Sequence, residues 1–346
     1  MEGSRSRSQI IVLFIALIIF IMLLFANFAY LNTQATYDKQ YIGHAGELRV
    51  LSQRIAKNAT EAAAGKAAAF KLLSDARNDF ARRWSYLKQG DPSTGLPPAP
   101  SAVRPEMRAV QTDWERLLKN TDAILTSEQT VLSLHQVAAT LAETVPQLQV
   151  EYEKVVEILL QRGAPAAQVA MAQRQSLLAE RILGAVNTVL SGDENSQQAA
   201  DVFGRDAARF GQVLTGMLQG DPALKVSQVE DRDARARLLE ISELFEFVSG
   251  SVDEIIETSP ELLKVRESAT NIFGLSQTLL DEASHLANGF ENLAGGRHTD
   301  TIGGYVLGLL ALASIILIGL VMVRETNRQL RETAEKNERN QNAIMR

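Results

Sequence analysis

The sequence carries two long apolar runs without a charged residue, one near each end. The first covers residues 10–31 and the second covers residues 303–323. At 1.5 Å per residue, a helix over the first run is about 33 Å long, enough to cross a hydrocarbon core of about 30 Å. This run exceeds the apolar part of a signal peptide, and no small-residue cleavage site follows it. We therefore expect two uncleaved membrane spans, the second with Gly304 and Gly308 at the spacing of a close-packing helix face.

Positive charges beside the two runs predict how the chain crosses the membrane. Lys and Arg near the end of a span favour the cytoplasmic side. They are Arg5 and Arg7 before the first run, and Arg324, Arg328 and Arg331 after the second. We expect residues 1–9 and 324–346 to lie in the cytoplasm. Residues 32–302 would then lie outside the cytoplasmic membrane.

The composition excludes several classes of function. Without cysteine, the chain has no disulfide, thiolate metal site or thiol nucleophile, and its 4 histidines lack a metal-binding spacing. A net charge of -6 argues against binding nucleic acid, which requires a basic surface. Nucleotide-binding, serine-hydrolase and zinc-protease motifs are missing, and adjacent acidic residues such as Asp253 and Glu254 do not face one another on a helix. We predict no enzyme, no cofactor and no metal.

The segment between the spans has an all-α pattern, rich in Ala, Leu, Glu, Gln and Arg. Residues 90–105 contain five of the 9 prolines and are predicted to form a loop. Pro146 predicts a kink or break, and Ser259-Pro260 predicts a helix start with proline in the first turn. The breakers leave about eight helices: 32–64, 66–89, 105–126, 128–162, 165–190, 195–219, 226–258 and 260–302.

An internal repeat organises these helices. Phe80–Pro92 and Phe210–Pro222 share Phe, Gln, Gly, Asp and Pro at an offset of 130 residues. Further matches are LSQRI at 51–55 with LAERI at 178–182, and Trp114-Glu115 with Phe245-Glu246. One repeat supplies four helices, which is enough for a four-helix bundle. We predict two repeated bundle modules, at residues 32–162 and 163–302.

The stretch GELRVLSQRIAKN contains an arginine at the edge of a helix core. Leu48, Leu51 and Ile55 form an apolar stripe, and Arg54 borders that stripe. Arg181 holds the equivalent place in the second repeat. A guanidinium there can bind an oxyanion with two hydrogen bonds. It can equally form an ordinary salt link to a neighbouring helix, so both readings stay open.

The LRVLSQRIAKNA run, the QGDP helix ends and the membrane hairpin resemble the PilJ family over residues 1–346. This family comprises the type IV pilus members of the methyl-accepting chemotaxis transducers. The first box also resembles the sensor helix of nitrate- and nitrite-responsive histidine kinases, in which an arginine binds the anion at a dimer interface. That arginine corresponds to Arg54. The resemblance implies a ligand-binding set of Ser52, Gln53, Arg54, Asn58 and Arg181.

The resemblance to PilJ implies an inner-membrane receptor that contacts pilin and forms a homodimer. Its signal would reach a CheA-like histidine kinase through CheW-like adaptors. Residues 324–346 resemble the start of a HAMP linker, and since family members continue beyond this point, we expect the output half to follow residue 346. Two alternatives remain: a small-anion sensor of a chemoreceptor or kinase, and a structural pilin-binding component without signalling.

Overall fold

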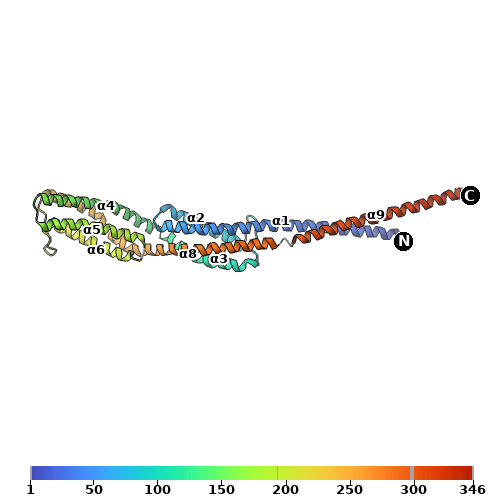
Figure 1. Ribbon diagram of the computed structural model, residues 1–346, viewed down its shortest axis with the longest axis horizontal. Helices are drawn as coiled ribbons and strands as arrows, with labels where there is room; N and C mark the ends of the chain where they lie inside the picture. The colour runs from blue at the N-terminus through green and yellow to red at the C-terminus, as the bar shows by residue number, and fades with distance from the viewer. Residues whose placement is uncertain (1, 193, 297–299, 345–346) are drawn as a thin grey trace. The chain divides into compact units, whose positions relative to one another are not determined.

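The computed structural model describes residues 2–192, 194–296 and 300–344, and this part of the chain is helical and contains no strand (Figure 1). The prediction of an all-α fold is confirmed. The helices are α1 (Glu2–Ala63), α2 (Ala67–Gln89), α3 (Arg104–Thr126), α4 (Glu128–Gln161), α5 (Ala166–Ser191), α6 (Ser196–Gln219), α7 (Arg232–Gly250), α8 (Val252–Gly296) and α9 (Asp300–Ile344), with a 3-10 turn at Ser101–Val103. Contacts divide the chain into two compact units, one of residues 1–46, 85–104 and 284–346, the other of residues 47–84 and 105–283.

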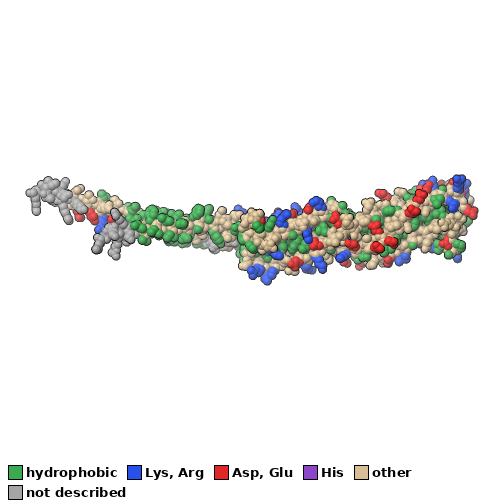
Figure 2. All heavy atoms as spheres, turned by 180° about the vertical axis from the view of Figure 1, so that it is seen from behind, with side chains coloured by type: hydrophobic (Ala, Val, Ile, Leu, Met, Phe, Trp, Pro, Cys, Tyr) green, Lys and Arg blue, Asp and Glu red, His purple; other side chains and the backbone are tan. Residues whose placement is uncertain are grey.

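The two predicted spans lie on α1 and α9, each long and apolar enough to cross a membrane. Figure 2 shows hydrophobic side chains gathered on these segments and charges mixed over the helices between them. On α9, Ala311, Ser314 and Ile318 are buried at helical spacing. Gly304 meets α1, because a Cβ there would lie 3.1 Å from the Asn27 side-chain oxygen, whereas Gly308 faces open space. The side chains of Arg5 and Arg7, and residues 345–346 of the tail, lie outside the described residues.

In the second unit, helices α4, α5, α6 and α7 pack against one another as a bundle. The first part of α8 contacts this bundle, through Glu254 to Ser133 of α4 and through Ile256 beside Gly204 of α6. The later part of α8 forms another group with the remaining helices of this unit. Phe80 of α2 stacks on Trp114 of α3 with ring centroids 4.0 Å apart. The Gln53 amide of α1 donates to the Ser276 carbonyl of α8 at 3.3 Å. Other contacts join α1 to α2 through Glu47 and Arg83, and α3 to α8 through Asn120 and Asn271.

This grouping differs from the predicted modules at residues 32–162 and 163–302. The fourth helix of the first repeat, α4, packs with α5 and α7 of the second repeat, and α8 packs with α1 and α3 of the first. The cause is the connection between α4 and α5. It covers only residues 162–165 and turns at Gly163, which has a φ of 69°. The left-handed conformation of Gly163 lets the chain reverse within this short link, so α4 and α5 become antiparallel neighbours. The single residues that join α3 to α4 and α7 to α8, Ser127 and Ser251, instead have φ values of -88° and -85°.

The two repeats nevertheless share their local structure. Gly90 and Gly220 end α2 and α6 with φ values of 89° and 87°. Asp91 then pairs with Leu96, and Asp221 with Val226, through backbone hydrogen bonds of 2.8–3.1 Å. The stacked rings of Phe80 and Trp114 also have a counterpart in Phe210 and Phe245, whose centroids lie 4.6 Å apart. The predicted repeat therefore has a structural counterpart at both turns and both aromatic pairs.

The predicted helix start at Ser259-Pro260 is wrong. Both residues lie inside α8, and the break falls earlier, at Ser251 between α7 and α8. Proline lacks the N–H that would bond to the carbonyl four residues before it. Here the Ser259 hydroxyl donates to that carbonyl, on Ile256, at 3.2 Å. The helix therefore continues. α4 also continues through Pro146, so of the predicted kink or break the break does not occur.

Helix α7 begins at Arg232, six residues later than the predicted range 226–258. Residues 226–231 instead follow the turn as extended chain, held by a hydrogen bond from the Val229 backbone N–H to the Met217 carbonyl at 2.8 Å. Asp231 then caps α7 by accepting from the backbone N–H groups of Asp233 and Ala234. The turn after Gly220 therefore includes residues that the hydrophobic periodicity of the sequence assigns to the helix.

Candidate functional site

The ligand residues predicted in the GELRVLSQRIAKN stretch all lie on α1, but their side chains point in different directions. Ser52 is buried, and its hydroxyl donates to a backbone carbonyl one turn earlier. Gln53 donates to Ser276 of α8. Arg54 is exposed and has no hydrogen-bond or ion-pair partner within the described part of the chain, while Asn58 is buried. Because consecutive helix residues are about 100° apart, Ser52 and Arg54 point in opposite directions and do not converge on one ligand within this chain.

Arg181 has a different environment from Arg54. Its guanidinium lies 3.0 Å from the carboxylate of Asp206 on α6, and the Asp206 side chain is only 12% exposed. At the repeat offset of 130 residues, Asp206 corresponds to Ala76 on α2. Alanine cannot pair with a cation, and Arg54 has no ion-pair partner within the described residues. The repeats thus present one neutralised and one unneutralised arginine.

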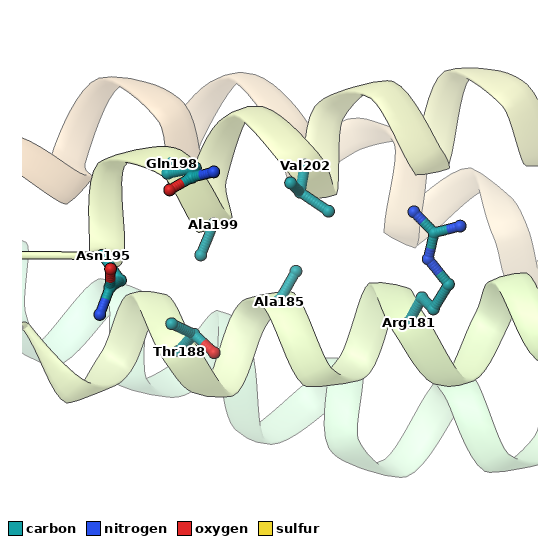
Figure 3. A pocket seen from close by; sticks show the side chains of 7 residues that line it. All are labelled: Arg181, Ala185, Thr188, Asn195, Gln198, Ala199 and Val202. Atoms are coloured by element: carbon teal, nitrogen blue, oxygen red, sulfur yellow. The ribbon is translucent and has the colours of Figure 1, made fainter.

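A pocket of about 330 Å³ lies between α5 and α6, with Arg181 at one end and Asn195 at the other (Figure 3). The pocket is open at its centre because Ala185 and Ala199 have side chains of a single carbon. The lining residues are Arg181, Ala185, Thr188, Asn195, Gln198, Ala199 and Val202. A small polar molecule would find hydrogen-bonding groups here, but the positive charge at Arg181 is offset by Asp206.

Sequence reasoning singled out Arg181 but missed the polar residues Thr188, Asn195 and Gln198 of this pocket. No spacing motif marks them, since they come from the end of α5, the following turn and the start of α6. These three residues could have been grouped from the sequence only by assuming that the consecutive helices α5 and α6 pack together. The pocket and the box on α1 are separate features.

Another cluster fixes the proline-rich loop to α1 in the first unit. The Tyr41 hydroxyl donates to the Pro97 carbonyl at 2.7 Å, and its ring stacks on Phe290 of α8 with centroids 5.0 Å apart. In the same loop, Asp91 accepts from the hydroxyl and backbone N–H of Ser93 at 2.7 and 2.9 Å. These bonds lower the pKa of the Asp91 carboxyl below its ordinary value, because they favour the charged form.

Two helices long and apolar enough to span a membrane, with helical bundles between them, match the architecture expected of the sensory region of a transmembrane receptor. Comparison with known proteins specifies the family. Residues 30–140 match the family model PilJ, described as the N-terminal region of the type IV pili methyl-accepting chemotaxis transducer. The chain belongs to the PilJ family.

Two curated relatives extend this match to nearly the whole chain. Protein PilJ of Pseudomonas aeruginosa is 73% identical over 344 residues, which cover 99% of this chain and 50% of that protein. A putative methyl-accepting chemotaxis protein of Alcanivorax borkumensis, AlkN, is 46% identical over 342 residues, which cover 97% of this chain and 49% of that protein. The chain therefore spans about half the length of the curated relatives it matches.

Proposed function

We propose that this chain is the sensory half of an inner-membrane chemotaxis transducer of the type IV pilus system. It senses pilin or the state of the pilus in the periplasm and signals to a CheA-like kinase through CheW-like adaptors, which controls twitching motility and surface responses. The observation that carries the proposal is α1, which runs from Glu2 to Ala63 without interruption. One helix thus contains both a candidate span and the GELRVLSQRIAKN stretch that packs against α2 and α8.

An unbroken helix can transmit a small displacement along its axis or a small rotation about it. A partner transmits a signal only if it binds one helix position more tightly than the other. The periplasmic placement of residues 32–302 rests on the positive flanks of the two spans. We propose a homodimer, the usual assembly of such receptors, and a receptor role without enzymatic chemistry.

The first test measures binding of a soluble type IV pilin domain to the whole chain in lipid nanodiscs by calorimetry. Saturable heat, absent with empty nanodiscs, is expected. A parallel test in cells measures kinase output from the full-length receptor with and without pilin. Binding without any change in output would favour the structural component that binds pilin without signalling. No binding and no pilin-dependent output would refute the proposed function.

A second candidate function, sensing of a small anion such as nitrate, is favoured by the exposed and unpaired guanidinium of Arg54. Nitrate and nitrite are titrated against the same nanodiscs. Heat that disappears in Arg54→Ala but persists in Arg49→Ala would support an anion site, because Arg49 is also an exposed arginine of α1. If no anion binds, or if both variants bind equally, Arg54 is not an anion ligand.

A further inference from the structure

We propose that a groove between α4 and α5 docks an amphipathic helix of a partner protein, one that carries Lys or Arg beside leucine-sized apolar side chains. This deepens the proposed function, on which it rests, by assigning a surface and a chemistry to the sensed protein. The groove has a volume of about 560 Å³. Its walls are Glu153, Val156, Glu157 and Leu160 of α4, with Gln173, Ser176 and Leu177 of α5.

Large apolar side chains lie exposed at both ends of this groove. Leu160 is 61% exposed at one end, and Leu177 is 62% exposed at the other. Val150, on the same face of α4 as Glu153 and Leu160, is 49% exposed and adds to the apolar surface near Leu177. The core of the bundle is already filled by other residues of these helices, such as Leu159 and Val155, which are buried. The exposed leucines therefore contribute nothing to the core and are available to a partner.

The groove also carries two negative charges, on Glu153 and Glu157. Glu153 and Glu157 form no ion pair with Lys or Arg within the described part of the chain. Glu157 accepts only a hydrogen bond from the neutral Gln161 amide. Glu151, on another face of the same helix, is by contrast paired with Lys154 at 2.7 Å and Arg237 at 3.3 Å. The unpaired carboxylates favour a partner that supplies its own cations.

The dimensions of the groove suit a helix. α4 and α5 are adjacent, and Gln149 of α4 contacts the Ser176 carbonyl of α5. At 1.5 Å per residue, the distance along α4 from Val150 to Leu160 is about 15 Å, or about three turns. A helix lying in a groove between two others contributes apolar anchors from one face at a spacing of three or four residues. Lys or Arg next to those anchors would reach Glu153 and Glu157.

The same charges disfavour two other occupants. A second copy of this chain that docked the same face about a two-fold axis would bring like carboxylates together. An anionic lipid surface would be repelled by Glu153 and Glu157. Charge complementarity therefore selects a cationic helix from another protein.

The test uses a fluorescent helical peptide of about five turns, with Leu along one face, Lys beside the leucines and Ala elsewhere. Its fluorescence anisotropy is measured against the whole chain in phosphatidylcholine nanodiscs, with empty nanodiscs as the blank. The binding variant is Glu153→Lys/Glu157→Lys. The matched control is Glu243→Lys/Glu246→Lys, which reverses two exposed carboxylates at a similar spacing on α7. Circular dichroism checks that both variants keep their helix content.

We expect the Lys peptide to bind the native chain and the α7 control, and to bind the groove variant at least about tenfold more weakly. A peptide with Glu in place of Lys is expected to show the reverse preference and to bind the groove variant. Leu160→Asp/Leu177→Asp should weaken both pairings. Equal binding of the Lys peptide to both charge variants, or no binding to the native chain, would overturn the proposal.

These results are separable from the proposed function. If kinase output in cells depends on pilin but is unchanged by Glu153→Lys/Glu157→Lys, the groove proposal fails and pilin sensing stands. If the peptides show the expected charge reversal but output never depends on pilin, the groove stands as a helix-binding surface and pilin sensing fails.

Discussion

Single residues decide how the turns of this molecule are built. Gly65 follows α1 with a φ of 77°, and Gly163 follows α4 with a φ of 69°. Each ends its helix with a backbone bond that spans five residues, Lys66 to Glu61 in the first and Ala164 to Leu159 in the second. The surroundings differ, because the His135 ring packs against Gly65 whereas open space surrounds Gly163.

We expect Gly65→Ala to destabilise the protein more than Gly163→Ala. Both variants place a side chain in the left-handed region, at a cost of about 1–2 kcal/mol. Only at Gly65 would the new Cβ clash with the His135 ring, and such overpacking costs about 1–3 kcal/mol more. Thermal unfolding followed by circular dichroism measures the difference. Equal melting temperatures would show that His135 moves aside freely.

Asp91 and Ser93 predict a pH-dependent contribution to stability. Since the pKa of Asp91 is lowered in the folded state, this contribution is present above the unfolded-state pKa of about 3.9 and is lost as the pH falls through the folded-state value. Ser93→Ala removes the hydroxyl donor, so its melting temperature should fall below that of the native chain at pH 7. The two should converge when the pH is below both pKa values. Ser101→Ala, in the same loop, should match the native chain throughout.

At the scale of elements, the sequence predicts helix positions well but their interruptions less well. The predicted ranges 66–89, 128–162 and 195–219 lie within a few residues of α2, α4 and α6. Hydrophobic periodicity is a local property, so it can be read without knowledge of packing. The helix start predicted at Pro260 is wrong because the Ser259 hydroxyl donates to the Ile256 carbonyl, which proline leaves without a backbone donor.

Ser259→Ala should therefore destabilise α8 through its neighbour Pro260. The Ile256 carbonyl would lose its donor, at a cost of about 1–3 kcal/mol. Ser276→Ala is the control, because Ser276 makes a similar bond to the Phe273 carbonyl and no proline follows it. In Ser259→Ala/Pro260→Ala, the new backbone N–H replaces the hydroxyl, so stability should recover. Additive losses in the double variant, measured by urea unfolding, would contradict this account.

At the scale of the whole molecule, the fourth helix of each repeat packs with helices of the other repeat. Four helices suffice for a bundle, so each repeat could have closed on itself. The short connection at residues 162–165 instead makes α4 a neighbour of α5, and α8 then lies beside α1. The structure groups the helices differently from the chain order of the repeats.

Cross-linking tests this grouping directly, because the chain contains no cysteine. Gln53→Cys/Ser276→Cys should link α1 to α8, and Gln149→Cys/Ser176→Cys should link α4 to α5. Gln53→Cys/Thr144→Cys would link only if the first repeat closed its own bundle, so we expect no product from it. Mass spectrometry after mild oxidation identifies the links. A strong α1–α4 product without an α1–α8 product would contradict the grouping.

The candidate site shows the same division between local and distant information. The sequence placed Arg54 and Arg181 at equivalent positions on their helices. It could not show that Arg181 pairs with Asp206 while Arg54 pairs with no carboxylate of the described residues, because that depends on which residue of a neighbouring helix lies opposite. The groove between α4 and α5 likewise has no motif, since its two walls belong to different predicted modules.

The sequence by itself determined the all-α fold, both candidate spans, most helix bounds and the repeated glycine–aspartate turns. These features depend on composition, on periodicity and on backbone conformations that few residues adopt, and all of them act over short stretches of chain. The tertiary structure decided which helices share a bundle, how α8 continues through Pro260, which arginine is neutralised and where leucines remain exposed. Those outcomes depend on contacts between residues far apart in sequence, where several pairings of amphipathic faces satisfy the same local pattern.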